Sequence, residues 1–464
     1  MSANAIAVNR FGLGYRLNEA NANEPKQWLT AQLTQYQAKS SAWANQRNTS
    51  AIVADLAQYQ MQTRNTSNKD QESVKSAFRR NVRDDYLAAV NARAQSTLTT
   101  PAPFVERLVH FWSNHFAVSV QKPAVTDLAG AFELEAIRPF VLGSFRDMLL
   151  AVEKHPAMLL YLDQAKSIGP NSRVAERLAA RDPSKKRGLN ENLAREILEL
   201  HTLGVRSGYT QADVTEFARA LTGWSVAGAN DKDKSANDKN VIEGVNGFVF
   251  RPQIHEPSNR MIMGKNYAQA NQAQAEAVLN DLASAPATAR HIATKLAQHF
   301  VSDMPPSGLI DKLANTFLSS GGNLTQVYQA LIDAPEAWQP TPTKFKTPWE
   351  WLISSLRGLG RSNLDGINIA QMLNELGQPV WKPGSPAGYD DSADTWAAPN
   401  ALLRRVEMAQ RLAAPLGDKL DARTLADKLL LGAISPATLA QISRAESATT
   451  GLALLLVCPE FLRR

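Results

Sequence analysis

The residues best suited to chemistry lie near the middle of the chain, where polar side chains recur among apolar ones. On a helix, Asn192, Glu196 and Glu199 would share one face, because four and three residues separate them. Two carboxyl groups this close repel each other, and burial raises the pKa of at least one of them. An acid/base pair requires this arrangement, so we predict Glu196 and Glu199 as catalytic residues.

Because two arginines could lie nearby, we predict that one of these carboxyl groups stays ionised. Arg195 directly precedes Glu196, and Arg138 ends an earlier predicted helix that also carries Glu133 and Glu135. The structural alternative is a buried network of Asn, Glu and Arg side chains that fixes crossing helices, since such networks also shift pKa values. The sequence leaves both interpretations open.

Two histidines, His115 and His255, could assist the carboxyl groups. Helical spacing from Phe104 turns His115 inward, and we prefer to interpret it as a core histidine that is hydrogen-bonded to a neighbouring helix. His155, His291 and His299 are predicted to be structural. We predict the following substrate-binding residues: Asn114, Arg138, Asn190, Asn192, Arg195, Trp224, Lys265, Trp381, Tyr389 and Trp396.

Trp381, Tyr389 and Trp396 belong to a loop rich in proline and glycine, residues 378–400. Aromatic rings on a stiff loop can form a stacking wall for sugars or planar ligands. They can equally fill a gap between helices, and this second interpretation is the one we prefer.

Motifs for a metal or a cofactor are incomplete, so both stay unknown. The single cysteine, Cys458, excludes an intramolecular disulfide and a cysteine-based zinc site. The sequence has no His-Glu-x-x-His, no glycine pattern for phosphates or dinucleotides, and no Gly-x-Ser-x-Gly. A metal site assembled from His115, Glu196, Glu199 and His255 is the arrangement left open.

Helices must position these residues, because apolar residues recur every three to four positions over most of the chain. We predict a mainly α fold: a large irregular helical bundle with one small inserted β-hairpin, formed by residues 248–250 and 261–263. Prolines 156, 286, 335 and 459 each follow an apolar helix end and predict the start of another helix.

Four regions are expected within one continuous globular unit. They are residues 1–100, 101–224, 225–270 and 271–464, of which the second is the helical core with the candidate site and the third contains a mobile loop and the hairpin. Residues 166–187 are basic and punctuated by glycine and proline, which favours a flexible flap.

Composition excludes several classes of protein. With 44% hydrophobic and 20% charged residues, the 464-residue chain is typical of a globular protein. Lys and Arg (50) nearly balance Asp and Glu (44), which argues against a nucleic-acid partner. Since no apolar run approaches the roughly 18 to 20 residues of a spanning helix, we predict no membrane insertion. The N-terminus lacks the apolar core of an export signal, which favours the cytoplasm.

Several motifs together resemble the bacterial family catalogued as domain of unknown function 1800. They occur in one order along nearly the whole chain: residues 9–14 (Asn-Arg-Phe-Gly-Leu-Gly), 111–116 (Phe-Trp-Ser-Asn-His-Phe), 190–196 (Asn-Glu-Asn-Leu-Ala-Arg-Glu), Tyr209-Thr210 with Asp213-Val214, Thr222-Gly223-Trp224, the His255 hairpin with Gly264-Lys265, Lys346 with Pro348, and Gly377-Gln378-Pro379. Family members often carry His at position 113, Asp at 256 and Phe at 201, where this chain has Ser113, Glu256 and His201.

The resemblance implies a helical protein whose reaction is uncharacterised. It also implies a genomic association with a second family, domain of unknown function 1501, which resembles sulfatases and often carries an export signal. We therefore hold two hypotheses. One is an enzyme of hydrolase or polymer-modifying type; the other is a non-catalytic scaffold or maturation partner of that sulfatase-like protein, which could carry this chain to the periplasm.

Overall fold

The chain folds mainly into α-helices, as the spacing of its apolar residues predicts. The computed structural model describes residues 1–17, 24–65, 67–181, 188–228, 241–417 and 419–464. Buried residues from both ends and from the middle of the chain form one continuous apolar core. Met1 and Arg464 both bond to the segment around residue 340, where Met1 N donates to Pro340 O and Arg464 N donates to Lys344 O.

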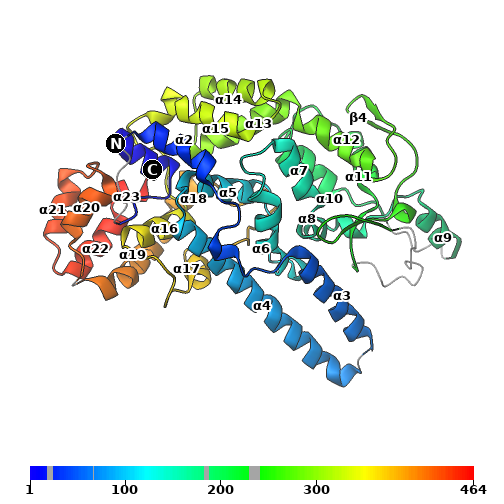
Figure 1. Cartoon of the computed structure of the whole chain (residues 1–464), viewed down its shortest axis with the longest axis horizontal. Helices are drawn as coiled ribbons and strands as arrows, with labels where there is room; N and C mark the ends of the chain where they lie inside the picture. The colour runs from blue at the N-terminus through cyan, green and yellow to red at the C-terminus, as the bar shows by residue number, and fades with distance from the viewer. Residues whose placement is uncertain (18–23, 66, 182–187, 229–240, 418) are drawn as a thin grey trace.

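The N-terminal part supplies a projecting arm and one central helix. Its helices are α1 (Ala3–Ala5), α2 (Pro25–Gln35), α3 (Thr49–Asn65), α4 (Asn68–Thr99) and α5 (Pro103–His115). Figure 1 shows α3 and α4 as an antiparallel pair that extends away from the rest of the molecule. Tyr59 and Phe78 stack within this pair, with ring centroids 3.9 Å apart. Helix α5, in contrast, is buried along nearly its whole length, which makes it an internal support.

The middle of the chain alternates short helices with two small sheets. The helices are α6 (Leu128–Phe132), α7 (Phe145–Lys154), α8 (Pro156–Tyr161), α9 (Arg173–Arg181), α10 (Asn192–Glu196) and α11 (Gln211–Leu221). The strands are β1 (Trp224–Val226), β2 (Ile242–Glu243), β3 (Phe248–Phe250), β4 (Arg260–Ile262) and β5 (Lys265–Tyr267).

The strands pair differently from the single hairpin that we predicted. β3 pairs with β1 and β2 in a three-stranded antiparallel sheet, and β4 pairs with β5 across the turn at Met263-Gly264. Met263 and Gly264 both have positive φ, as this tight turn requires. The apolar run that ends at Met263 therefore turns back on the residues that follow it. The predicted flap holds α9, and residues 182–187 lie outside the described residues, as do 229–240 of the predicted mobile loop.

The C-terminal part is mainly helical. Its helices are α12 (Gln272–Ala283), α13 (Pro286–Phe300), α14 (Ser307–Ser319), α15 (Leu324–Asp333), α16 (Pro348–Gly358), α17 (Ile369–Glu375), α18 (Ala393–Trp396), α19 (Pro399–Ala413), α20 (Ala422–Leu430), α21 (Pro436–Ser443), α22 (Ala448–Val457) and α23 (Pro459–Leu462). In Figure 1, α12 to α15 lie along one edge and α19 to α23 form the end opposite β4.

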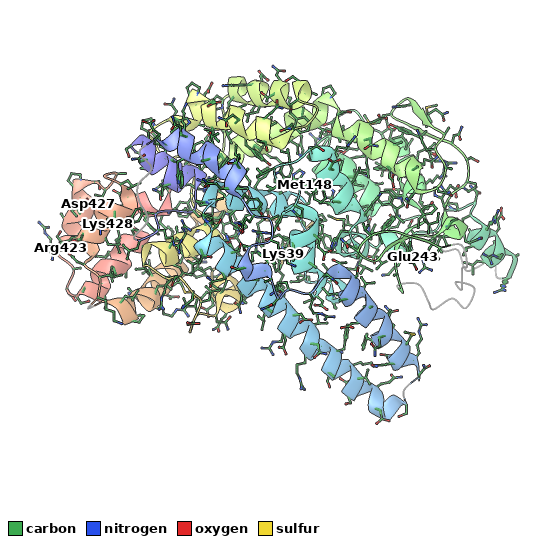
Figure 2. The ribbon with its side chains drawn as sticks, viewed as in Figure 1. Lys39, Met148, Glu243, Arg423, Asp427 and Lys428 are labelled. Atoms are coloured by element: carbon green, nitrogen blue, oxygen red, sulfur yellow. The ribbon has the colours of Figure 1, made fainter. Side chains whose placement is uncertain are left out.

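Local sequence signals explain where many of these helices begin. Pro156, Pro286 and Pro459 each occupy the first position of an α-helix, and Pro335 opens a 3₁₀ turn, which confirms the prediction from the proline pattern. Helix α20 illustrates the amphipathic rule: Arg423, Asp427 and Lys428 extend from its outer face in Figure 2, whereas its leucines are buried.

Three π-helical turns occur among the described residues, at Ile6–Phe11, Glu133–Ile137 and Ile197–His201. The second and third contain Glu133 and Glu199, which we singled out from the sequence, and the first overlaps the Asn-Arg-Phe-Gly-Leu-Gly motif at residues 9–14. A π turn bonds residue i to residue i+5, which changes the side-chain spacing from that of an α-helix. No helix in the described part of the chain is both long enough and apolar enough to cross a membrane.

Candidate functional site

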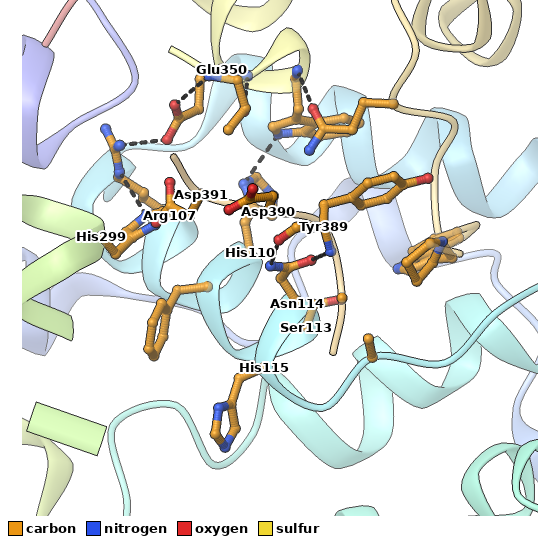
Figure 3. Close-up of a pocket in the computed structure, with 18 of the residues that line it drawn as sticks. Arg107, His110, Ser113, Asn114, His115, His299, Glu350, Tyr389, Asp390 and Asp391 are labelled. Carbon is orange, nitrogen blue, oxygen red and sulfur yellow. Dashed lines mark hydrogen bonds and ion pairs between the residues drawn. The ribbon is translucent and has the colours of Figure 1, made fainter. Parts of the chain in front are cut away.

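A cavity of about 450 Å³ lies between helices that are far apart in the sequence. Helix α5 forms its floor, α13 and α16 form two sides, and the loop of residues 378–392 closes it over (Figure 3). Arg93 of α4 also contributes. Ala387 and Asp390 of the loop are exposed to solvent, so the loop marks the entrance. We call this space the central cavity.

Glu350 is the anchor of the central cavity's charged wall. It sits in the first turn of α16, where a capping box pairs its backbone and carboxylate with Thr347. The same carboxylate accepts from Arg107 Nη2 at 2.5 Å and from Arg464 Nε at 3.0 Å. Burial alone would favour the neutral acid, but the two arginines hold the pKa of Glu350 well below its usual range. This group is therefore a fixed anion.

His299 connects this anion to the entrance loop. Its Nδ1 donates to Asp391 Oδ2 at 2.7 Å, and its Nε2 accepts from Arg107 Nε at 3.2 Å. Burial lowers the pKa of His299 to about 4, against the opposing charge of Asp391. Since both ring nitrogens are occupied and the ring stays neutral, His299 orients its neighbours and is not a free base.

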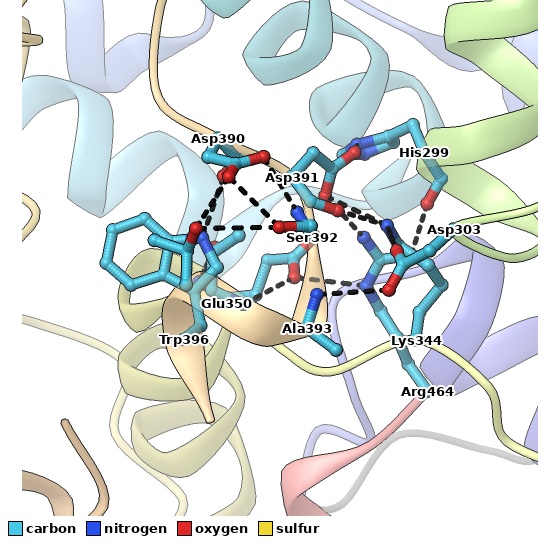
Figure 4. Close-up of polar contacts among 12 residues, drawn as sticks. His299, Asp303, Lys344, Glu350, Asp390, Asp391, Ser392, Ala393, Trp396 and Arg464 are labelled. Carbon is cyan, nitrogen blue, oxygen red and sulfur yellow. Dashed lines mark hydrogen bonds and ion pairs between the residues drawn. The ribbon is translucent and has the colours of Figure 1, made fainter. Parts of the chain in front are cut away.

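Asp391 brings the entrance loop into the same network (Figure 4). Its Oδ1 lies 3.5 Å from both Lys344 Nζ and Arg464 Nη2. Lys344 also contacts Asp303 at 2.5 Å and donates to the backbone carbonyl of Asp391. The loop is thus tied by charge to α13 and to the last residue of the chain.

Lys295 is a cation of the central cavity that these contacts do not use. It projects from α13 one turn before His299, and its side chain is only half-buried. Among the described residues, it makes no hydrogen bond and no ion pair. Burial lowers the pKa of Lys295 to about 8, and the more distant charge of Asp391 offsets only part of this effect. A fraction of Lys295 is therefore a neutral amine near neutral pH.

Asn114, one of the predicted substrate-binding residues, holds the entrance loop in place. Its Nδ2 donates to Tyr389 O at 2.8 Å, and its Oδ1 accepts from Tyr389 N at 2.7 Å. Gly388, at a φ of +84°, lies so close that a Cβ there would be 2.4 Å from Asn114 O. Both ends of the amide are occupied by backbone, so Asn114 positions Tyr389 and has little capacity left for a ligand.

The aromatic residues of the loop divide between the two predicted roles. Trp381 and Trp396 are buried, as the gap-filling interpretation requires, and Trp396 Nε1 donates to Asp390 O at 2.7 Å. Tyr389 is half-buried, lines the central cavity and donates to Pro379 O. Trp381 also lines the cavity, while Trp396 is not among its lining residues.

Of the four predicted catalytic residues, His115 alone lines the central cavity. Its Nε2 donates to His201 O at 3.1 Å, which is the predicted hydrogen bond to a neighbouring helical segment. Its ring points away from Asn114 and Tyr389 in Figure 3, toward the rings of His201 and His291. Burial, followed by the charge of Lys295, keeps the pKa of His115 well below the usual histidine range.

Glu196 and Glu199 lie elsewhere and are half-buried. They belong to the α10 segment, by which we mean α10 together with the π turn Ile197–His201 that follows it. As predicted, the pKa of Glu196 is raised, first by burial and then by the negative charge of Glu199. Arg195 pairs with Glu191 at 3.2 Å and with Glu199 at 3.6 Å. Arg138 does not take part, because its guanidinium is buried against Glu106, with contacts of 2.8 and 2.6 Å. The strong pull of that buried carboxylate corrects our placement of Arg138.

The other predicted residues lie outside the lining of the central cavity and do not form one cluster, although Asn192 N donates to Asn190 Oδ1 at 2.9 Å. His255 Nδ1 donates to Thr222 O at 2.7 Å, Trp224 is fully buried against Phe248, and exposed Lys265 pairs with Asp281. Asn190 bonds to Leu162 O, and Asn192 is exposed at the start of α10. No group of three or more His, Cys, Asp and Glu side chains in the described ranges is arranged to hold a metal. The four-residue metal site that the sequence left open is therefore not assembled.

Sequence reasoning missed the residues that form the cavity's charged wall. These are Arg107, Lys295, His299, Glu350 and Asp391. A signal was present in the spacing: His291, Lys295 and His299 follow one another at four-residue intervals on α13. On α5, Arg107, His110 and Asn114 make a similar polar stripe on an otherwise apolar helix. Two such stripes indicate helices whose polar faces meet inside the protein.

Comparison with known proteins gives one match. No curated protein and no solved structure matches the chain. A family model described as protein of unknown function (DUF1800) matches residues 6–463, which is nearly the whole chain and includes every residue of the central cavity. The chain therefore belongs to the DUF1800 family, in agreement with the motifs from Asn9 to Pro379.

Proposed function

We propose that the protein is an enzyme of hydrolase or polymer-modifying type whose reaction takes place in the central cavity. The observation that carries this proposal is Lys295, a half-buried ammonium group at the cavity wall for which the described residues provide no counter-ion at contact distance. A general base works best when its pKa lies near the working pH, and enzymes reach this with lysine through burial. The pKa of Lys295, lowered to about 8, has this property.

The chemistry would be a proton transfer at Lys295 Nζ. The neutral amine takes a proton from a water molecule as the water oxygen attacks an electrophilic carbon, phosphorus or sulfur centre of the substrate. The resulting ammonium then returns that proton to the departing oxygen, so that lysine ends the cycle unchanged. His299 and Asp391 keep the α13 side of the cavity rigid, which fixes where the amine stands.

The reactivity of Lys295 tests this proposal without a known substrate. A lysine-selective acylating reagent, applied at a series of pH values and followed by peptide mass spectrometry, measures the rate at each lysine. We expect the rate at Lys295 to reach half its maximum near pH 8. Lys382, exposed on the entrance loop but outside the cavity lining, is the internal control. Reaction at Lys295 only above about pH 10, as for ordinary lysine, would refute the role of base.

Activity is the second test. Purified protein is screened against chromogenic carboxyl esters, glycosides, phosphate esters and sulfate esters, with K295M and K382M as matched variants. We expect turnover that K295M abolishes and K382M leaves intact. If K295M retains the turnover while it remains folded, the proposed reaction centre is wrong.

A second candidate function is that of a helical scaffold or maturation partner for the sulfatase-like companion family. The α3–α4 arm favours it, because a helical pair that extends from the body presents a long surface, including Met61, which is 53% exposed (Figure 1). Under this proposal the chain either stays in the cytoplasm or travels to the periplasm with the companion. Native co-purification with the companion, lost in M61D and kept in K295M, would support it.

A further inference from the structure

Arg93 has a place in the central cavity that the charged wall does not explain. It lies on α4, is 9% exposed and lines the cavity. The other arginine that lines the cavity, Arg107, uses its guanidinium on Glu350, His299 and the carbonyl of Gly12. Arg93 is different, because within the described ranges of the chain only the Nε edge of its guanidinium has an ion-pair partner.

That edge is in ion-pair contact with a carboxylate, although Nε makes no hydrogen bond of regular geometry. Arg93 Nε lies 2.9 Å from Glu133 Oε2, and the same carboxylate oxygen accepts from Trp381 Nε1 at 3.2 Å. The guanidinium carbon lies 4.5 Å from the ring centre of Trp349 and 5.2 Å from that of Trp381. Such cation–π contacts fix the plane of the group. The guanidinium is therefore oriented before any ligand arrives.

The backbone of the entrance loop is strained at the residue that provides this support. Trp381 has a φ of +48°, a conformation that bulky residues avoid at a cost of about 1 to 2 kcal/mol. Val120 N donates to Trp381 O at 2.8 Å and keeps it there. Strain of this kind persists where surrounding contacts impose it, and it is concentrated at ligand sites.

The other end of the Arg93 guanidinium carries its two amino groups, Nη1 and Nη2. Neither donates a hydrogen bond to any residue in the described part of the chain, and neither is fully enclosed by protein. Two parallel N–H groups at a fixed orientation match the two oxygens of a carboxylate. The Ser113 hydroxyl and the Gln298 amide also line the cavity without a bond to the described residues, so they can serve neutral polar groups of the same ligand.

We propose that the central cavity binds a small hydroxylated carboxylate, with its carboxylate on the two free amino groups of Arg93. Such a carboxylate would be the substrate of the proposed enzyme, so its catalytic role rests on the proposed function. Its binding to the cavity does not. A singly charged carboxylate fits better than a phosphate dianion, because three acidic residues, Asp303, Asp390 and Asp391, line the same cavity. Lys295 lines the same cavity and would act on the body of the ligand.

Binding to the full chain tests the proposal, with glucuronate and acetate as carboxylate probes. Glucose, glucose 6-phosphate and inorganic sulfate serve as comparators, and isothermal titration calorimetry measures each dissociation constant. We expect glucuronate to bind at least about tenfold more tightly than glucose and than glucose 6-phosphate. Acetate should compete with glucuronate for the same site. Glucuronate binding no tighter than glucose, or weaker than glucose 6-phosphate or sulfate, overturns the proposal.

The matched variants are R93K and R93Q. Lysine keeps a positive charge beside Glu133 but loses the paired donors, so R93K should fold normally and weaken glucuronate binding at least about tenfold. R93Q should weaken it further, and circular dichroism checks that it is folded. Unchanged affinity in R93K places the carboxylate elsewhere and refutes the assignment.

Lys295 separates this proposal from the proposed function. K382M should retain glucuronate binding within a few-fold, because Lys382 lies outside the cavity lining and the carboxylate contacts Arg93. If Lys295 lacks enhanced reactivity while R93K still weakens binding, the enzyme proposal fails and the carboxylate site stands. If Lys295 is reactive and no carboxylate binds, the carboxylate site fails and the reaction centre stands.

Discussion

The central cavity and the α10 segment contain similar residue types, yet they are built in opposite ways. On α10, the arginine of each ion pair lies four residues from its carboxylate, as in Arg195 with Glu191 and Glu199, and these side chains are half-exposed. In the cavity, Arg107 and Glu350 are 243 residues apart and His299 and Asp391 are 92 apart, and their contacts are shielded from solvent. Helical periodicity reveals the first kind of contact and cannot reveal the second.

The energetic contrast follows from burial. An ion pair between exposed side chains contributes about 0 to 1 kcal/mol to stability, because water screens both charges. Loss of one partner from a buried pair leaves an uncompensated charge and costs about 3 to 5 kcal/mol. The two regions should therefore respond very differently to the same substitution, and each prediction below compares them on this basis.

The largest effect is expected for E350Q. Glutamine can still complete the capping box with Thr347, so the substitution removes mainly the charge that faces Arg107 and Arg464. We expect a loss of about 3 to 5 kcal/mol in the free energy of unfolding, measured by urea denaturation. The matched control is E375Q, which breaks the exposed pair with Arg411 and should cost less than about 1 kcal/mol. Similar losses in both variants would contradict the contrast.

The pH dependence of the unfolding free energy should reveal the contribution of Glu350. The pKa of Glu350 in the folded protein lies below that of an unfolded glutamate, about 4.3. The unfolded chain therefore binds the proton first, and the stability from Glu350, present above this value, is lost as the pH falls through and below it. We expect the wild type to lose more unfolding free energy between about pH 5 and 3 than E350Q does. Parallel curves for the two proteins would contradict this assignment.

Removal of the Lys295 ammonium group should raise the free energy of unfolding, whereas removal of the Glu350 charge should lower it. Its pKa falls from 10.5 to about 8 on folding, so the folded state disfavours the ammonium form at neutral pH. This penalty is complete below pH 8 and disappears as the pH rises toward the unfolded value, so K295M should stabilise the protein by about 1 to 2 kcal/mol at pH 7. Near about pH 10.5 the gain should be small. Gain of stability with loss of activity is typical of a functional residue, whereas K382M should change neither.

Much of the fold could be predicted because it depends on local signals. The proline at the start of α13, the Thr210–Asp213 capping box of α11 and the left-handed Gly204 after the α10 segment each fix an element boundary through neighbouring residues. We did not predict the strand pairing, because β3 pairs with β1, which precedes it by more than twenty residues in the chain. Such a choice depends on packing that no single window of sequence contains.

The candidate site could be predicted only in part, for the same reason. His115, Asn114, Trp381 and Tyr389 were found because they stand in dense polar or aromatic segments, and they do line the central cavity. Lys295 and Asp391 stand in segments that resemble ordinary solvated surface, since lysine and aspartate are common there. What makes them unusual is the low exposure that three distant helices and one loop impose together, and that becomes visible only in three dimensions.

The smallest effect is expected on the α10 segment. E196Q should change the unfolding free energy by less than about 1 kcal/mol, because water still reaches this half-buried carboxyl group. E199Q should lower the pKa of Glu196 toward its usual value, since it removes the neighbouring negative charge, and NMR titration of the Glu196 side chain can measure this. Turnover that persists in E196Q and is lost in K295M would place the reaction in the central cavity. The reverse result, with both variants folded, would return it to the carboxyl pair that the sequence first suggested.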